Sequence, residues 1–384
     1  MKVRKRLIHD FNDAEKAVKS VGVHDKVWKV MAEKTLFQVL EIDDVSVPAA
    51  NIMKQIAISR GSDAIVNKKV VVNDVEKSTV LIPGTVRELK LISEELKKQD
   101  FGLPEVGDEI LGLLGKNKSA REFSIMGILN ITPDSFSDGG AYFDEKEARN
   151  RFEQIEKEGA DIIDIGAESS RPGSARLDCK EELERLEKVF PLFETASIPV
   201  SIDTYKSEIA EVALSKGARI VNDISALRMD DRMVNVISDY NCKVVLMHMK
   251  GTPETMQKNP YYEDVIREIG DFFEDRISFC LSKGIKEDKI ILDPGIGFGK
   301  RQEDNLNILS KLDELTSYGF PILIGASRKS FIGKITGEKE DKRLDGSIAS
   351  AVYSYLKGAS ILRVHDVKQT INAVSVISAV LEAK

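Results

Sequence analysis

From about residue 120 to the C-terminus, short runs rich in β-branched residues alternate with longer amphipathic runs rich in charge. The short runs are apolar along nearly their whole length, which is typical of parallel strands covered on both faces. The longer runs have helical spacing, and KSEIAEVALSKG ends at Gly217, a residue type common just beyond a helix. The predicted strands are Ile125–Thr132, Asp161–Ser169, Pro199–Thr204, Arg219–Ser225, Lys243–Met249, Lys289–Gly295, Pro321–Ser327 and Ser360–Asp366. Eight strands that alternate with helices over about 250 residues predict a (β/α)8 barrel, an α/β fold.

Polar side chains gather where each of these strands ends. In a barrel the C-terminal ends of the strands converge on one face, which is where barrel enzymes have their active sites. The residues are, in strand order, Asn130 and Thr132; Ser169, Ser170 and Arg171; Asp203; Asn222 and Asp223; His248; Asp293; Ser327, Arg328 and Lys329; and Arg363, His365 and Asp366. The pattern therefore predicts an enzyme with one site at this face.

The first 118 residues follow a different rhythm and predict a smaller α/β or α+β domain. Its predicted strands are TLFQVLEIDD, DAIVN and STVLIPGT, and its predicted helices are VPAANIMKQIAISRGS and VRELKLISEELKKQD. We expect domains at 1–118 and 119–384, with FGLPEVGDEILGLLGKNKSA as the link. This part has no nucleotide or metal-binding spacing, so we expect an interaction or stability module of unknown role.

Composition limits the partners and the compartment. The net charge of −7 argues against a general nucleic-acid binder, and no apolar run approaches the ~20 residues of a membrane helix. The N-terminus has no apolar segment typical of a signal peptide. Cys179, Cys242 and Cys280 show no paired spacing, which fits a reducing compartment. We expect a cytoplasmic protein without nucleic-acid or membrane partners.

Two basic clusters predict an anion site. GASRKS places Arg328 and Lys329 at a strand end and at a helix start, where the helix dipole disfavours cations. RVHD adds Arg363 and His365, two donors that suit a phosphate or a diphosphate. Ordinary surface charges are the alternative interpretation. For His248 we favour a structural role.

Acidic and amide groups at three other strand ends allow several interpretations. Asp203, Asn222 and Asp293 together can pair with a flat heterocycle that carries several N–H and carbonyl groups. A buried hydrogen-bond network and a metal site are the alternatives. The run DPGIGFGK lacks the spacing of a nucleotide P-loop. Its glycines are better explained as a sharp turn that presents Asp293 and Phe298 to a ligand.

Seven runs resemble, in order and spacing, the dihydropteroate synthases of the pterin-binding barrel superfamily. They are MGILNITPDSFSDGG, DIIDIGAESSRPGS, VSIDTYK, IVNDIS, ILDPGIGFGK, ILIGASRKSFIG and GASILRVHDV. The family joins 6-hydroxymethyl-7,8-dihydropterin diphosphate to 4-aminobenzoate and forms 7,8-dihydropteroate and diphosphate in folate biosynthesis, so the resemblance implies a transferase. The N-terminal part is similar to extensions on some archaeal and anaerobic bacterial members.

The resemblance also implies a role for each matching residue. Asp203, Asn222, Asp293 and Lys329 would hold the pterin, with Met247 against its ring; Asn130 would coordinate Mg²⁺ on the diphosphate; Arg363, His365 and Arg171 would take the phosphate oxygens; and Ser170, Pro172, Phe298 and Ser330 would shape the aminobenzoate pocket. Asp203, Lys329, Arg363, His365 and Arg171 are the catalytic candidates. The loops Asp134–Gly140 and Arg171–Ala175 would close over the site, and a homodimer is implied.

Small departures leave alternatives open. Ala167 stands where the family usually has Gly, and Ser170 where Thr is common, so a larger ribosylated arylamine from methanopterin synthesis stays possible as a substrate. A methyltetrahydrofolate–corrinoid methyltransferase would not need Arg363 and His365. A non-catalytic pterin-binding homologue would be expected to lose residues such as Asn130, Asp134 or Arg171.

Overall fold

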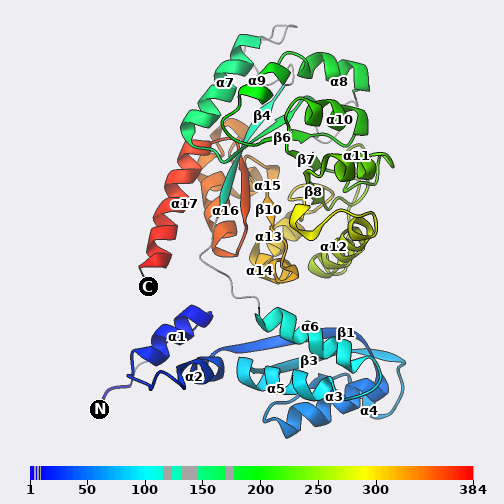
Figure 1. Ribbon diagram of the computed structural model, residues 1–384, viewed down its shortest axis with the longest axis vertical. Coiled ribbons are helices and arrows are strands. Elements are labelled where there is room, and N and C mark those ends of the chain that lie inside the picture. Colours follow the sequence, from blue (N-terminus) through cyan, green and yellow to red (C-terminus); the bar gives the residue numbers. More distant parts are fainter. Residues whose placement is uncertain are drawn as a thin grey trace. The chain divides into compact units, whose positions relative to one another are not determined.

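The computed structural model describes residues 1–3, 6, 8, 10–115, 123–131, 145–168 and 177–383. The chain divides into two compact units, Met1–Ser119 and Ala120–Ala383. Figure 1 shows both units.

The second unit is a barrel of eight parallel strands. The strands are β4 (Ser124–Asn130), β5 (Ile162–Gly166), β6 (Val200–Asp203), β7 (Ile220–Asp223), β8 (Lys243–Met247), β9 (Ile290–Asp293), β10 (Leu323–Ile324) and β11 (Ile361–Val364). They pair in the order β10-β11-β4-β5-β6-β7-β8-β9. A parallel bridge between Leu292 and Ile322 joins β9 to the start of β10 and completes the ring. The predicted fold class is therefore confirmed.

Helices surround the strands on the outside of the barrel (Figure 1). They are α7 (Glu145–Glu158), α8 (Cys179–Leu186), α9 (Phe190–Thr195), α10 (Ser207–Ser215), α11 (Met233–Tyr240), α12 (Val265–Ser282), α13 (Gln302–Ser310), α14 (Leu312–Leu315), α15 (Ser330–Thr336), α16 (Leu344–Leu356) and α17 (Val367–Glu382). The short 3-10 helices are η2 (Glu287–Lys289), η3 (Thr316–Tyr318) and η4 (Glu340–Lys342). A large apolar core lies between the helices and the strands.

A separate apolar layer fills the inside of the barrel. It consists of Met126, Ile162, Ile220, Val245, Ile291, Leu323 and Ile361, all buried. Because alternate residues of a strand point to the same face, the residue two positions further along each strand also points inward, but closer to the strand's C-terminal end. Those positions hold Ile128, Asp164, Asn222, Met247, Asp293, Gly325 and Arg363. The apolar layer therefore forms the floor of the polar mouth.

The first unit is a three-stranded antiparallel sheet with helices. Its strands are β1 (Phe37–Ser46), β2 (Ile65–Val66) and β3 (Lys77–Thr85), in the order β1-β3-β2, and its helices are α1 (Phe11–Lys19), α2 (Trp28–Thr35), α3 (Val47–Ser59), α4 (Lys68–Val71), α5 (Val86–Leu96) and α6 (Leu103–Gly115). Thr85 and Glu88 form a capping box at the start of α5, each accepting a hydrogen bond from the other's backbone. The three predicted strands and two predicted helices are all found.

The link predicted at residues 101–120 is wrong for most of that stretch. Residues Leu103–Gly115 form α6, and Leu103 and Ile110 are buried in the core of the first unit. The Ser93 hydroxyl donates to the carbonyl of Gly107 at 2.7 Å, which ties α6 to α5. The run contains four glycines, which have low helix propensity, but burial of its apolar face outweighs that cost over Leu103–Gly115.

The barrel strands are shorter than predicted. The ladder of β8 ends at Met247, that of β10 at Ile324 and that of β11 at Val364, each before the polar residues that we included. Thr132 and Ser169, the predicted ends of the first two strands, lie outside the described residues. Within the described part of the chain, no helix is long and apolar enough to span a membrane.

The fit of the helices on β4 makes a testable prediction at Gly127. A Cβ atom there would lie 2.6 Å from Cγ2 of Ile155 in α7 and 3.0 Å from Cγ2 of Val367 in α17. We expect Gly127→Ala to destabilise the barrel by about 1–3 kcal/mol, the usual cost of an overpacked core. Urea unfolding would measure the change. Gly112→Ala in α6, where a Cβ meets nothing within 4 Å, serves as the control. Equal stability of the two variants would contradict this account of the packing.

Candidate active site

One arginine occupies the centre of the barrel mouth. Arg363 of β11 donates from Nε to Oδ2 of Asp164 at 2.5 Å and from Nη2 to Oδ2 of Asp203 at 2.6 Å. The Asn222 side chain donates to the same Asp164 oxygen at 3.1 Å. Four side chains from β5, β6, β7 and β11 thus form one connected network.

Sequence reasoning missed Asp164. It lies inside a predicted strand rather than at its end, and its side chain is fully buried. Its Oδ1 atom has no hydrogen-bond partner among the described residues. The signal was present, because Asp164 is two residues after the inward-facing Ile162 and must therefore point into the barrel.

Burial makes two of the mouth carboxyls weak acids. It raises the pKa of Asp203 to about 7, against the opposing effect of the Arg363 charge. It raises the pKa of Asp293 to about 6, although the Gly295 N–H that donates to Asp293 Oδ1 at 2.7 Å favours the charged form. Both groups therefore change charge close to neutral pH.

A small cavity brings most of the predicted ligand-binding residues together. It is lined by Asp203, Asn222, Ile224, Met247, Asp293, Ile296, Phe298, Gly325, Lys329 and Arg363. The ammonium group of Lys329 lies 4.1 Å from the centre of the Phe298 ring, a cation–π arrangement. The cavity thus has acceptors, donors and a flat apolar wall.

His365 lies beside the mouth on a separate set of contacts. Its Nδ1 atom is 3.0 Å from the hydroxyl of Ser327, and its backbone N–H donates to the same hydroxyl at 3.3 Å. Burial, together with the charges of Arg328 and Arg363, lowers the pKa of His365 to about 3. The imidazole is therefore neutral at pH 7. Arg328 is paired with Asp366, at 2.6 Å between Nη2 and Oδ1.

The remaining site predictions have different outcomes. Asn130 is half-buried at the end of β4, and Ser330 is exposed as the first residue of α15. Ser170, Arg171 and Pro172 lie outside the described residues, as do both predicted loops, 134–140 and 171–175. His248 has the structural surroundings that we favoured, since it is buried, with Nδ1 3.0 Å from the Lys300 ammonium.

The glycines after β9 serve a backbone turn, as the sequence indicated. Gly295 and Gly299 have φ values of +69° and +62°. A Cβ on Gly295 would lie 2.1 Å from the carbonyl oxygen of His248, and one on Gly299 would lie 2.5 Å from that of Lys250. No other residue type fits these two positions, because both the torsion angle and the space exclude a side chain.

Donors for a metal ion are few. Considering only the residues that are described, no group of three or more His, Cys, Asp or Glu side chains is placed to hold an ion. Asn130 can offer an amide oxygen, a hard ligand of the kind that Mg²⁺ accepts. Since Mg²⁺ commonly takes one or two protein ligands and completes its shell with water and substrate phosphates, this donor suits an ion that arrives with a diphosphate.

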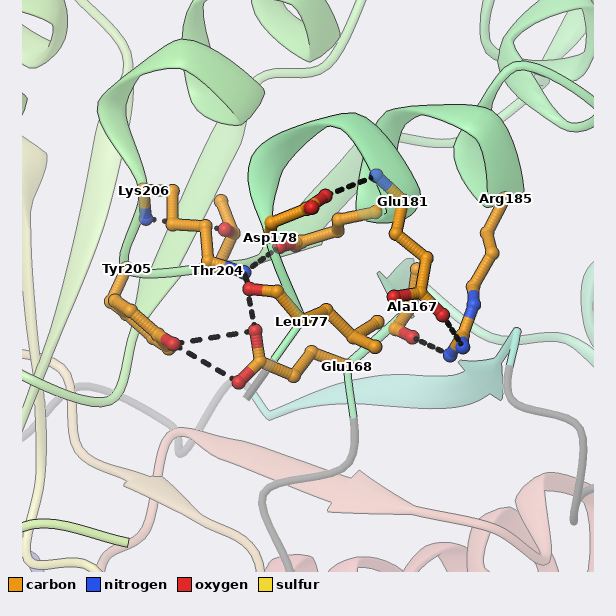
Figure 2. Close-up of polar contacts among 10 residues, drawn as sticks. Ala167, Glu168, Leu177, Asp178, Glu181, Arg185, Thr204, Tyr205 and Lys206 are labelled. Carbon is orange, nitrogen blue, oxygen red and sulfur yellow. Dashed lines mark hydrogen bonds and ion pairs between the residues drawn. The ribbon is translucent and has the colours of Figure 1, made fainter. Parts of the chain in front are cut away.

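A second polar cluster flanks residues 169–176. Figure 2 shows Lys206, just after β6, reaching both sides of that stretch. Its Nζ atom donates to Glu168 Oε2 at 2.5 Å, to the Leu177 carbonyl at 2.8 Å and to Glu182 Oε2 at 2.5 Å. The hydroxyl of Tyr205 also donates to Glu168, at 3.0 Å (Figure 2). The cluster joins the last residue described before the stretch to the first described after it.

Comparison with known proteins agrees with this site. The sequence profile of the family described as pterin binding enzyme matches residues 126–365. The dihydropteroate synthase of Escherichia coli strain K12 is 42% identical over 264 residues, which cover 68% of this chain and 92% of that protein. A Yersinia pestis dihydropteroate synthase, solved with a sulfonamide drug, has a TM-score of 0.66 at 39% identity and covers 69% of this chain and 96% of its own. One from Xanthomonas albilineans, solved with 4-aminobenzoic acid, has a TM-score of 0.64 at 40% identity over 68% and 93% of the two chains.

The barrel is that of a pterin-binding transferase. The chain belongs to the pterin-binding enzyme family and, within it, to the dihydropteroate synthases of folate biosynthesis. The family resemblance and the transferase function predicted from the sequence are confirmed.

The Lys206 cluster generates a stability prediction. The side chains of Glu168 and Glu182 are 13% and 1% exposed, so losing the cation would leave two buried carboxylates facing each other. We expect Lys206→Met to cost about 3–5 kcal/mol in the free energy of unfolding, as when one partner of a buried ion pair is removed. Urea unfolding followed by circular dichroism would measure it.

Lys357→Met is the matched control, because Lys357 pairs with Asp313 on a more exposed surface. That variant should lose no more than about 1 kcal/mol. Similar losses of unfolding free energy in the two variants would show that the Lys206 cluster stabilises the fold no more than a surface ion pair does.

Proposed function

We propose that the barrel mouth joins 6-hydroxymethyl-7,8-dihydropterin diphosphate to 4-aminobenzoate, with Asp203, Asn222, Asp293 and Lys329 binding the pterin. The observation that supports this most is the single cavity that these four residues line with Met247, Phe298 and Arg363. Acceptors and donors from five strand ends face a space that has apolar walls, as recognition of a flat heterocycle requires.

The pterin ring presents an amino group and ring N–H groups on one edge and a carbonyl on another. Carboxylates of Asp203 and Asp293 would accept from the N–H groups, and Lys329 and Asn222 would donate to the carbonyl and the ring nitrogens. One oxygen of Asp293 is taken by the Gly295 N–H, which leaves the other for the ligand. Met247, 2% exposed, would pack its thioether against the ring face.

Arg363 would serve the pterin and the diphosphate together. The guanidinium carries five N–H donors, and its bonds to Asp164 and Asp203 leave donors for an anion. Neutral His365, with Nδ1 accepting from the Ser327 hydroxyl, would donate its Nε2–H to a phosphate oxygen. Arg171 would add a second cation. Mg²⁺ bound to the diphosphate would neutralise the leaving group, with Asn130 as one ligand.

The reaction needs a stabilised cation more than a base. The bond between the pterin methylene carbon and the diphosphate oxygen breaks, and the electron pair leaves with the diphosphate. The amine nitrogen of 4-aminobenzoate then forms the new C–N bond and releases one proton to solvent. Asp203, close to the ring, would stabilise the positive charge on the pterin. No strong general base is required, because the arylamine is neutral at pH 7.

The second substrate would lie against Phe298 and Ser330, with Ser170 and Pro172 completing its pocket. We propose 4-aminobenzoate rather than a ribosylated arylamine. The Xanthomonas relative, whose structure contains 4-aminobenzoic acid, is 40% identical to this chain and gives the support.

Diphosphate release tests the proposal directly. Purified protein with the dihydropterin diphosphate and Mg²⁺ should release diphosphate when 4-aminobenzoate is added, and much more slowly with a ribosylated arylamine. Asp203→Asn should lower the rate at least tenfold, the scale of a hydrogen bond to a charged group, about 1.5–3 kcal/mol. Asp313→Asn, at the surface pair with Lys357, is the control. Absence of release with either arylamine would refute the proposal.

The raised pKa values predict a pH dependence. As pH falls through about 7 and then about 6, Asp203 and Asp293 gain protons and lose their capacity to accept from the pterin N–H groups. Affinity for the dihydropterin should therefore decrease over this range. Using 6-hydroxymethyl-7,8-dihydropterin without its diphosphate removes any contribution from phosphate protonation. In Asp293→Asn the step near pH 6 should disappear, whereas an unchanged profile would contradict the role of Asp293.

We further propose a cytoplasmic homodimer. The three cysteines are free, and two of them are buried, which suits a reducing compartment. Val376 and Val380 on α17 and Tyr353 on α16 are exposed apolar side chains on two packed helices, as a subunit contact requires.

A further inference from the structure

Lys300 is a buried cation that the proposed chemistry does not use. Its residue is 3% exposed. The ammonium group donates to the carbonyl of Phe298 at 3.0 Å and to the carbonyl of His248 at 3.2 Å, and it lies 3.0 Å from Nδ1 of His248. Burying a cation is costly unless it is well bonded, so this position needs a reason.

The contacts of Lys300 join two neighbouring loops of the barrel mouth. His248 follows β8, and Phe298 lies in the loop after β9. Burial lowers the pKa of Lys300 to about 7, against the opposing charges of Asp293 and Asp304. Both the charged and the neutral amine have enough N–H donors for the two carbonyls.

Three other side chains hold the same loop from outside. The Gln257 amide donates to the Gly297 carbonyl at 2.9 Å, and the Tyr262 hydroxyl donates to the Gly299 carbonyl at 2.7 Å. The Gly297 N–H donates to Asn305 Oδ1 at 2.7 Å. Together with Lys300, these bonds fix the backbone on both sides of Phe298.

The Phe298 ring, 9% exposed, is the part of this loop that meets the site. It lines the cavity, and Lys329 lies above its face at 4.1 Å. A displacement of the loop would move the Phe298 ring away from Lys329 and change the shape of the cavity.

We propose that Lys300 is a positioning residue that holds Phe298 against Lys329 and thereby sets the affinity of the site for the arylamine. The link to the arylamine rests on the proposed function. The role of Lys300 in fixing the loop does not depend on the proposed function. KM values test the first role, and hydrogen exchange tests the second.

The test compares Lys300→Met with the wild-type chain. Methionine keeps the length of the side chain and removes the charge and the donors. We expect the KM for 4-aminobenzoate to rise at least tenfold, while the KM for the dihydropterin diphosphate changes less than threefold. We also expect the backbone amides of residues 295–299 to exchange hydrogen at least tenfold faster, measured by mass spectrometry.

Two further variants keep the outcome decisive. Tyr262→Phe removes a different hydrogen bond to the same loop and leaves every charged group in place. It should raise the KM for 4-aminobenzoate and speed hydrogen exchange at residues 295–299, even if Lys300→Met does not fold. Lys334→Met removes an exposed cation on α15 and should shift neither.

Equal rises in both KM values, or unchanged exchange at residues 295–299 in Lys300→Met and Tyr262→Phe, would overturn the inference. If the wild-type chain released no diphosphate, the proposed function would fail. The exchange comparison would then decide by itself whether Lys300 holds the loop.

Discussion

The barrel mouth depends on one guanidinium between the buried carboxylate of Asp164 and the half-buried carboxylate of Asp203. Arg363 bonds Asp164 and Asp203, and Asn222 joins through Asp164, so four strands contribute to a single network. Without the cation, two carboxyl groups would face each other above the apolar layer of the barrel, at a cost of several kcal/mol. The network thus places Asp203 and Asn222, two of the proposed pterin ligands, before any substrate binds.

Two lysines, Lys206 and Lys300, also connect separate parts of the chain near the barrel mouth. Lys206 joins both flanks of residues 169–176 to the end of β6, and Lys300 joins the loops after β8 and β9. Lys300 binds carbonyls of two different loops, whereas Lys206 binds acceptors before and after a single stretch of chain. The bonds of Lys300 hold the loops after β8 and β9 together, and transfer between two bound substrates requires site residues at fixed positions.

Much of this could be predicted from the sequence. The alternation of eight apolar strands with amphipathic helices predicted the barrel. The polar residues at the strand ends predicted a common location for Asp203, Asn222, Asp293, Lys329 and Arg363, and these do line one cavity. The ion pairs between these side chains could not be predicted. Arg363 was expected to serve an anion, and the structure places it first against two carboxylates, because partners on separate strands are not visible in a linear pattern.

The misses have physical causes of the same kind. Asp164 was hidden inside an apolar run, and Lys300 was read only as the end of a glycine-rich turn. Whether a lysine lies in water or in the core depends on contacts made by residues far along the chain, here His248 and Phe298. The run 101–120 was expected to be a link, whereas burial of its apolar residues in the first unit makes most of it the helix α6.

The central claim is that Arg363 and Asp164 act as one unit in shaping the pterin site. A double-mutant cycle with Arg363→Met and Asp164→Asn, read as the dissociation constant of 6-hydroxymethyl-7,8-dihydropterin, tests it most directly. If they do, the double variant should bind within about twofold of Arg363→Met alone, because the bond between the two residues is already lost and an asparagine at position 164 keeps an oxygen that can accept from Asn222. Losses in affinity that multiply in the double variant would contradict it.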